Sequence, residues 1–129
     1  MIIFFLENVP FSYSTGLDYA TIVISILDQY AATHPNKPIT LLEIGSGSGL
    51  LAYRILDLLY KQKKPYAKKL NMIVTDFSEE IINQIKQSGL FKQYLTQVRF
   101  EVFNFITDSY KKYKSCNIVL MTYLLDSVP

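Results

Sequence analysis

The spacing of hydrophobic residues predicts alternating helices and strands along most of the chain. From Leu17 to Ala31, apolar side chains recur at three- and four-residue intervals, which is the pattern of one buried helical face. Pro35 and Pro38 end this helix, because proline lacks an amide hydrogen and restricts the residue before it. Residues 39–44 then form a short, nearly continuous apolar run, which is typical of a strand buried on both faces of a parallel sheet.

The alternation continues toward the C-terminus and indicates an α/β protein. Strands that alternate with helices imply right-handed crossovers and a parallel sheet. Glu79 and Glu80 favour a helix start after Ser78, where the side chain caps the helix and the dipole attracts negative charge. The expected elements are a helix at 17–33, a strand at 39–44, a helix at 50–60, a lysine-rich loop at 61–69, a strand at 71–75 ending at Asp76, a helix at 79–87, a strand at 98–103, a polar connector or short helix at 108–114, and a strand at 117–122.

Length and composition fit one globular domain and exclude several classes. The 129 residues carry 13 Lys and Arg against 11 Asp and Glu, and this small net charge of +2 makes no electrostatic case for nucleic acid as a partner. The single Cys116 and single His34 rule out a disulfide framework and a zinc module, so we expect no metal. No apolar run reaches the roughly 18–20 residues of a membrane span, and residues 1–6 do not resemble a secretory signal. We therefore expect a cytoplasmic protein that does not act at a membrane.

The segment LLEIGSGSG, residues 41–49, joins the first buried strand to the next helix. Gly45, Gly47 and Gly49 allow the backbone to turn tightly and to approach a ligand, and the amides of the following helix point toward it. This predicts a nucleotide-type cofactor loop, although a purely structural turn has the same composition. Leu50 stands where the dinucleotide fingerprint needs its third glycine, which disfavours NAD.

Two carboxylates narrow the choice of ligand. Glu43 lies inside an apolar strand, where an unpaired carboxylate is costly, so a ligand with an ammonium group would suit it. Asp76 ends the neighbouring strand, where a carboxylate can accept both hydroxyls of a ribose. S-adenosylmethionine carries both groups. Two structural alternatives stay open: Glu43 could bond backbone amides at the strand end, and Asp76 could cap the next helix.

On these residues the sequence resembles the class I S-adenosylmethionine-dependent methyltransferases from Leu41 to Pro129. LLEIGSGSG is similar to the family's first motif, which implies that Glu43 and the glycines surround the methionine end of the cofactor. IVTDFS is similar to the second, which implies Asp76 on the ribose and Phe77 against adenine. FEVFNF and NIVLMTYLLDSVP are similar to the third and fourth strands. The cofactor residues expected from this resemblance are Glu43, Gly45, Ser46, Gly47, Gly49, Asp76, Phe77, Asn104 and Phe105, with Phe77 and Phe105 equally explicable as core.

The ending YLLDSVP is similar to a segment of MidA-like methyltransferases, which modify a protein arginine. Thr122 and Tyr123 depart from the Asn-Glu that tends to precede this segment in that group. Tyr123 and Asp126 are the candidates for substrate orientation or proton removal, although an apolar helix start followed by a polar turn explains them equally well. Methyl transfer needs no universal catalytic residue, because the sulfonium is already activated. The resemblance implies transfer to a nitrogen or oxygen nucleophile, with a protein among the candidate acceptors.

The resemblance also implies a Rossmann-like, three-layer parallel sheet in the order 3-2-1-4-5-7-6, of which this chain supplies about four strands in the order 3-2-1-4. We divide it into an N-terminal segment and helix, 1–38, and the first half of a methyltransferase domain, 39–129. The chain therefore reads as a fragment, whose fourth strand would be an exposed apolar edge. The alternative function is a noncatalytic α/β half-domain that pairs with a partner chain at that edge.

Overall fold

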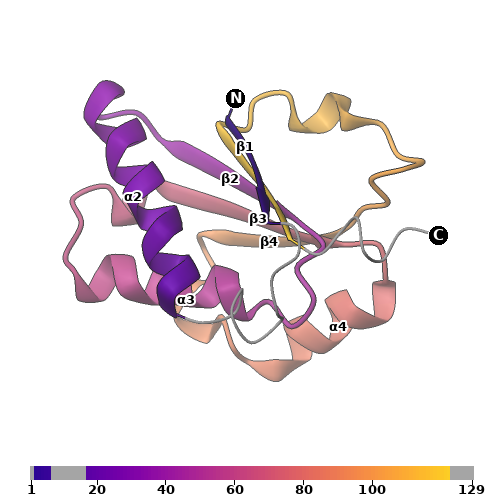
Figure 1. The fold of residues 1–129 in the computed structure, drawn as a ribbon. Coiled ribbons are helices and arrows are strands. Elements are labelled where there is room, and N and C mark those ends of the chain that lie inside the picture. The colour runs from indigo at the N-terminus through magenta and orange to yellow at the C-terminus, as the bar shows by residue number, and fades with distance from the viewer. Residues whose placement is uncertain (1, 7–16, 123–129) are drawn as a thin grey trace.

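The computed structural model of the protein describes residues 2–6 and 17–122, and side chains from 18 to 121 (Figure 1). The described helices and strands alternate as the hydrophobic pattern predicts. Short 3-10 turns lie at Ala67–Lys69, Lys92–Tyr94 and Tyr110–Tyr113. The helices and strands are β1 (Ile2–Leu6), α2 (Leu17–Thr33), β2 (Ile39–Ile44), α3 (Leu50–Lys61), β3 (Leu70–Asp76), α4 (Glu79–Ser88), β4 (Val98–Val102) and β5 (Ile118–Thr122).

The described strands form one parallel sheet in the order β1-β5-β2-β3-β4. Counted without β1, this is the predicted order 3-2-1-4, which is confirmed together with the α/β class. In the register of the sheet, Glu43 on β2 lies opposite Val74 on β3 and Leu120 on β5. Asp76 ends β3 opposite Val102. The carboxyl ends of the strands therefore bring Glu43 and Asp76 to the same edge of the sheet.

The expectation of an exposed fourth-strand edge was wrong. The backbone of β1 pairs with the whole of β5, from Ile2 opposite Ile118 to Leu6 opposite Thr122. The N-terminal strand was not predicted, because its five apolar residues carry no periodic signal and their partner lies at the other end of the chain. The chain thus covers this edge itself, and a partner chain is not needed there.

Helices cover one face of the sheet and a connector covers the other (Figure 1). The larger core packs α2, α3 and α4 against side chains such as Leu41, Val74 and Leu120. The smaller core packs the segment between β4 and β5 against the opposite face, around Phe103 and Tyr113. Because side chains alternate along a strand, Glu43 and Asp76 point to the helix-covered face, as Leu41 and Val74 do.

The helix ends follow the signals in the sequence. Gly49, with φ of 78°, precedes α3, and Gly89, with φ of 72°, follows α4. The Ser78 hydroxyl accepts a hydrogen bond from the Ile81 amide at 3.3 Å, which confirms the predicted cap. Helices α3 and α4 consequently begin at the carboxyl edge of the sheet, beside the glycine loop.

Candidate functional site

The glycine loop is held by the end of the neighbouring strand. Gly45, Gly47 and Gly49 all have positive φ, which side-chain-bearing residues rarely adopt. The amides of Gly45 and Ser46 donate to the Thr75 carbonyl at 3.1 and 2.9 Å. A Cβ placed on Gly47 would meet no atom of the described residues within 4 Å, whereas one on Gly49 would touch the side chains of Ile85 and Phe91 at 3.3 Å. Within the described structure, Gly47 thus faces open space, and Gly49 packs closely against α4 and the segment after it.

Glu43 is an uncompensated carboxyl group inside the protein. Its side chain is 1% exposed, and Oε2 has no hydrogen-bond partner among the described residues. Burial raises the pKa of Glu43 to about 8, and the negative charge of Asp76 adds to the rise. The predicted carboxylate in an apolar strand is therefore present, and Oε2 is bonded to no backbone amide within the described chain.

Asp76 connects the glycine loop to the start of α4. Its Oδ2 accepts from the Gly47 amide at 3.1 Å, and its Oδ1 accepts from the Ser78 amide at 3.0 Å. The side chain is 4% exposed. Its bond to Ser78 agrees with the structural alternative, while its bond to Gly47 places it in the loop. Each carboxylate oxygen has further acceptor capacity, so a ribose assignment stays a prediction.

Thr75 was not singled out from the sequence, yet it joins β2 and β3 at this edge. Its hydroxyl is fully buried and donates to the Glu43 carbonyl at 2.7 Å, and its carbonyl accepts both loop amides. A hydroxyl residue next to Asp76 in a buried strand is the signal that could have found it. Ser46 resembles Glu43 in one respect: its buried Oγ also has no partner among the described residues.

The predicted adenine-side residues lie beyond the ends of β3 and β4. Phe77 follows Asp76 and is 58% exposed. Asn104 organises its own loop, since its Oδ1 accepts from the Ile106 and Thr107 amides. Phe105 is half-buried against the smaller core. The Phe103 amide donates to the Asp76 carbonyl at 2.9 Å, which joins this loop to the carboxyl edge. Their contact with adenine stays a prediction.

Some predictions concern residues or groups that the structure does not place. Tyr123 and Asp126, the candidates for proton removal, lie outside the described residues. Within residues 2–6 and 17–122, no three His, Cys, Asp or Glu side chains are grouped as a metal site requires. Among the described helices, none is both long and apolar enough to cross a membrane.

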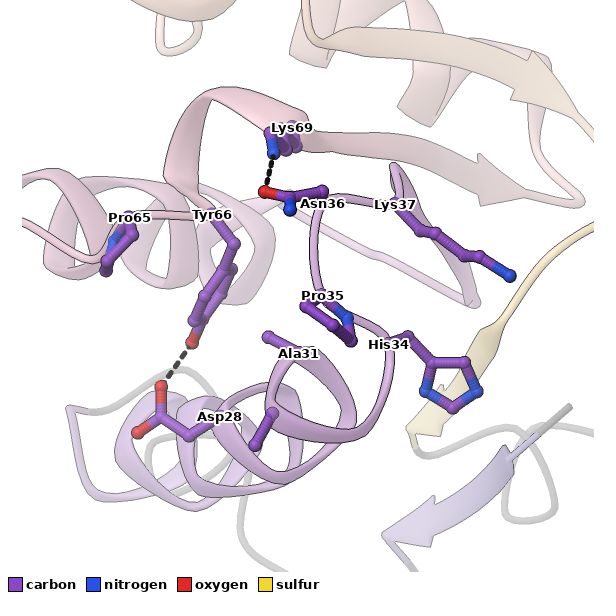
Figure 2. A pocket seen from close by; sticks show the side chains of 10 residues that line it. Asp28, Ala31, His34, Pro35, Asn36, Lys37, Pro65, Tyr66 and Lys69 are labelled. Carbon is purple, nitrogen blue, oxygen red and sulfur yellow. Dashed lines mark hydrogen bonds between the residues drawn. The ribbon is translucent and has the colours of Figure 1, made fainter.

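A cavity of about 320 Å³ lies at the opposite, amino-terminal end of the strands (Figure 2). It is bounded by the end of α2 and the lysine-rich segment before β3. Polar side chains around this cavity bond one another. The Asp28 carboxylate accepts from Tyr66 at 2.5 Å and from Lys64 at 2.9 Å, and Lys69 donates to Asn36. The carboxyl edge differs, because there the buried acceptor Oε2 of Glu43 has no described partner.

Comparison with models of protein families shows which family the chain belongs to. Residues 21–129 match the model of a family described as "Putative S-adenosyl-L-methionine-dependent methyltransferase". The chain belongs to this family. S-adenosyl-L-methionine is therefore the cofactor named for the family, and the resemblance seen at the glycine loop and at Asp76 is confirmed at family level. A search of the curated proteins finds no match.

Solved methyltransferase structures share the fold of this family member. The DszA carbon methyltransferase superposes with a TM-score of 0.63 at 21% identity, over 81% of this chain and 27% of that one. A COG1565 superfamily member from Burkholderia thailandensis, bound to S-adenosyl-homocysteine, superposes with a TM-score of 0.60 at 18% identity, over 89% of this chain and 27% of that one. The N-terminal domain of EvdMO1, with S-adenosylhomocysteine bound, has a TM-score of 0.56 at 16% identity, over 84% and 38%. The chain spans about a quarter to two-fifths of the length of these proteins.

Proposed function

We propose that this family member binds S-adenosylmethionine at the carboxyl edge of β2 and β3. It takes part in transfer of the methyl group to a nitrogen or oxygen nucleophile, and a protein is among the candidate acceptors. The observation that carries the proposal is the buried Oε2 of Glu43, which has no partner among the described residues and lies beside Asp76 and the open side of Gly47. A buried carboxyl group without a partner is costly unless a ligand satisfies it.

The residues present fit the cofactor group by group. Glu43 supplies the negative charge that an ammonium group needs, and Asp76 supplies the acceptor for ribose hydroxyls. The open side of Gly47 leaves room for a ligand to approach the loop backbone, since no atom of the described residues lies within 4 Å of a Cβ placed there. We assign Ser46 to the same end, because its buried Oγ is free to bond a polar ligand group. Phe77, with its exposed ring, is assigned to adenine.

The cofactor supplies a methyl group on a positively charged sulfur, so the protein's task is chiefly alignment. The carboxyl edge of β2 and β3 provides this alignment. Thr75 ties Glu43 to the glycine loop, and Asp76 ties the loop to α4, so that the carboxylates hold fixed positions relative to each other. Tyr123 and Asp126 are the proposed groups for orienting the acceptor or removing its proton.

Calorimetric titration of the purified chain with S-adenosylhomocysteine, NAD and ATP tests the cofactor assignment. Saturable binding of S-adenosylhomocysteine alone is expected. Binding of NAD instead, or no binding of S-adenosylhomocysteine by a monomeric, folded chain, would overturn it. Light scattering and circular dichroism on the same sample establish that the chain is monomeric and folded.

The acceptor class is tested separately with methyl-labelled S-adenosylmethionine and acceptor proteins from the same cell. A methyl ester on oxygen is released by mild base, whereas a methyl group on nitrogen is retained and appears as a methylated amino acid after acid hydrolysis. A label carried on carbon would contradict the proposed acceptor class while leaving the cofactor assignment intact.

A further inference from the structure

The two carboxyl groups at the candidate site form a buried acidic pair. Glu43 and Asp76 point to the same face of the sheet from neighbouring strands, and they are 1% and 4% exposed. Asp76 receives two backbone amides, whereas Glu43 Oε2 receives no hydrogen bond from a described residue. Two like charges confined in a medium of low polarity disfavour each other's ionisation. With no described donor for its Oε2 and the charge of Asp76 nearby, Glu43 therefore favours its neutral form.

No cationic side chain compensates this pair. All 13 Lys and Arg residues and the single His lie between residues 17 and 122, within the part of the chain that the structure describes. In the described structure the ion pairs engage other carboxylates, namely those of Asp28, Asp57 and Glu101. A positive charge for Glu43 must then come from a ligand.

Among the described residues, few other titratable groups lie on the elements around Glu43. β5 and the glycine loop have none, and β3 contributes only Asp76. The first turns of the covering helices contribute Asp18 and Tyr19 on α2 and Tyr53 and Arg54 on α3. Of these groups, Asp76 is the one whose charge acts on Glu43, and its effect has the same sign as that of burial.

We propose, on the basis of the function proposed above, that Glu43 is a neutral carboxylic acid in the free protein and releases its proton to solvent when the cofactor's ammonium group binds. The O–H bond of the carboxyl group breaks, the proton passes to water or buffer, and the resulting carboxylate accepts a charge-assisted hydrogen bond from the ammonium. Cofactor uptake is therefore coupled to proton release, and it strengthens as the pH rises.

The size of the coupling follows from the titration of Glu43. With the pKa of the free protein's Glu43 at about 8, the group is mostly protonated at neutral pH. Roughly 0.9 proton should be released per bound ligand at pH 7, and affinity should rise on the order of tenfold between pH 6.5 and 8.

The experiment is calorimetric titration of the full chain with S-adenosylhomocysteine at pH 7 in phosphate and in Tris. These buffers differ in ionisation enthalpy, so the difference in observed heat counts the protons released. Two controls accompany it. 5′-Methylthioadenosine lacks the amino-acid end of the ligand and should release no proton. Glu43→Gln removes the titrating group and should abolish both the release and the tenfold pH effect.

The outcomes separate this inference from the proposed function. Binding of S-adenosylhomocysteine without buffer-dependent heat leaves the cofactor assignment standing and overturns the proton coupling. Equal proton release with 5′-methylthioadenosine also overturns it, because the ammonium would then not be the cause. Absence of binding defeats the proposed function itself. Where Glu43→Gln does not fold, the comparison of the two ligands in the two buffers on the unaltered chain still decides.

Discussion

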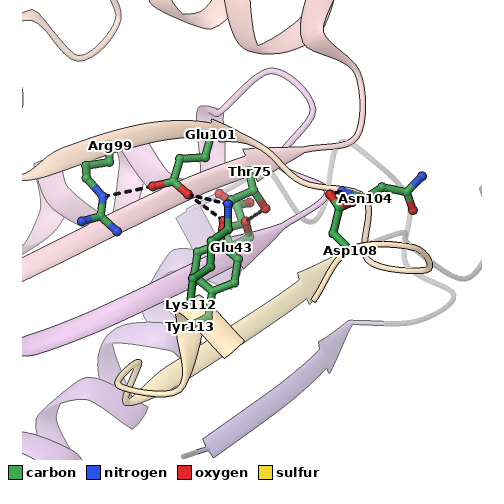
Figure 3. A network of polar contacts seen from close by, with 8 residues as sticks. All are labelled: Glu43, Thr75, Arg99, Glu101, Asn104, Asp108, Lys112 and Tyr113. Atoms are coloured by element: carbon green, nitrogen blue, oxygen red, sulfur yellow. Dashed lines mark hydrogen bonds and ion pairs between the residues drawn. The ribbon is translucent and has the colours of Figure 1, made fainter. Parts of the chain in front are cut away.

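Glu43 and Glu101 are carboxyl groups of the same sheet that differ in their surroundings (Figure 3). Glu101, on β4, accepts from Tyr113 at 2.7 Å and pairs with Arg99 at 3.2 Å and Lys112 at 3.3 Å. Burial alone would raise its pKa, but the hydrogen bonds from Tyr113 and Lys112 and the nearby positive charges hold the pKa below its ordinary value. Glu43 has burial and a negative neighbour, and its pKa rises to about 8.

These surroundings indicate that Glu101 has a structural role and Glu43 does not. Glu101 lies on an edge strand at the protein surface and ties the connector before β5 to the sheet through Tyr113 and Lys112. Oε2 of Glu43 has no hydrogen-bond partner in the part of the chain that the structure describes, and Glu43 is costly to bury in its charged form. A costly group that the fold leaves unsatisfied is a good candidate for ligand binding. Substitutions near Glu43 should therefore change ligand binding, and substitutions near Glu101 should change only stability.

The largest expected effect is on the pH dependence of stability. The pKa of Glu43 is higher in the folded than in the unfolded chain. The contribution of Glu43 to the free energy of unfolding is therefore largest below pH 4.5 and is lost as the pH rises toward 8. The free energy of unfolding should fall by on the order of 4 kcal/mol across this range. Urea unfolding at a series of pH values should show the fall in the unaltered chain and a flat profile in Glu43→Gln. A fall of equal size in the variant would assign it to another group.

Asp76→Ala should weaken S-adenosylhomocysteine binding by roughly 1.5–3 kcal/mol, because charge-assisted hydrogen bonds to the ribose are lost. The variant also removes the acceptor of the Gly47 and Ser78 amides and the negative charge beside Glu43. The pH at which the Glu43 proton is released should consequently move down. Unchanged affinity in calorimetry would exclude the ribose assignment, and circular dichroism would verify that α4 is retained.

Gly47→Val should abolish detectable ligand binding while the chain stays folded. The new side chain would fill the open side of the loop and would also be strained at φ of 55°, at a cost of about 1–2 kcal/mol. Gly89→Val is the matched control, because Gly89 has φ of 72° and equally open surroundings after α4, away from the loop. Both variants should lose similar thermal stability, and only Gly47→Val should lose binding. Retained binding in Gly47→Val would contradict the role given to the loop.

The smallest expected effect is the loss of stability when the hydrogen bond to Glu101 is removed. Tyr113→Phe removes one hydrogen bond to the Glu101 carboxylate and should cost about 1–2 kcal/mol of stability without changing ligand affinity. Because the pKa of Glu101 is lowered in the fold, this loss should be full above pH 4.5 and should shrink as the pH falls below it. Tyr110→Phe, which removes an exposed bond to the Phe105 carbonyl, is the control and should cost less. A loss of ligand affinity in Tyr113→Phe would contradict the assignment of Glu101 as a purely structural carboxyl group.

Helix and strand positions were largely predictable where local signals are strong. The helix at 17–33 and the strand at 39–44 agree with the structure in every residue, because prolines separate them and a glycine ends the strand. The strand predicted at 98–103 ends one residue earlier, at Val102, although the Phe103 amide still donates to the carbonyl of Asp76, the partner of Val102. The lysine-rich segment at 61–69 contains a 3-10 turn over its last three residues, which a run of lysines does not announce.

The order of the elements, the glycine loop and the two carboxylates are local features, because each depends on residue type at short spacing. Two other features depend on contacts between distant parts of the chain. The pairing of β1 with β5 joins the two ends of the chain, and no local pattern encodes that contact. The absence of a described partner for Glu43 Oε2 likewise depends on which side chains the other elements bring near it. Residue type places a carboxyl group in a strand, but its ionisation is set by burial and by neighbours from elsewhere in the chain.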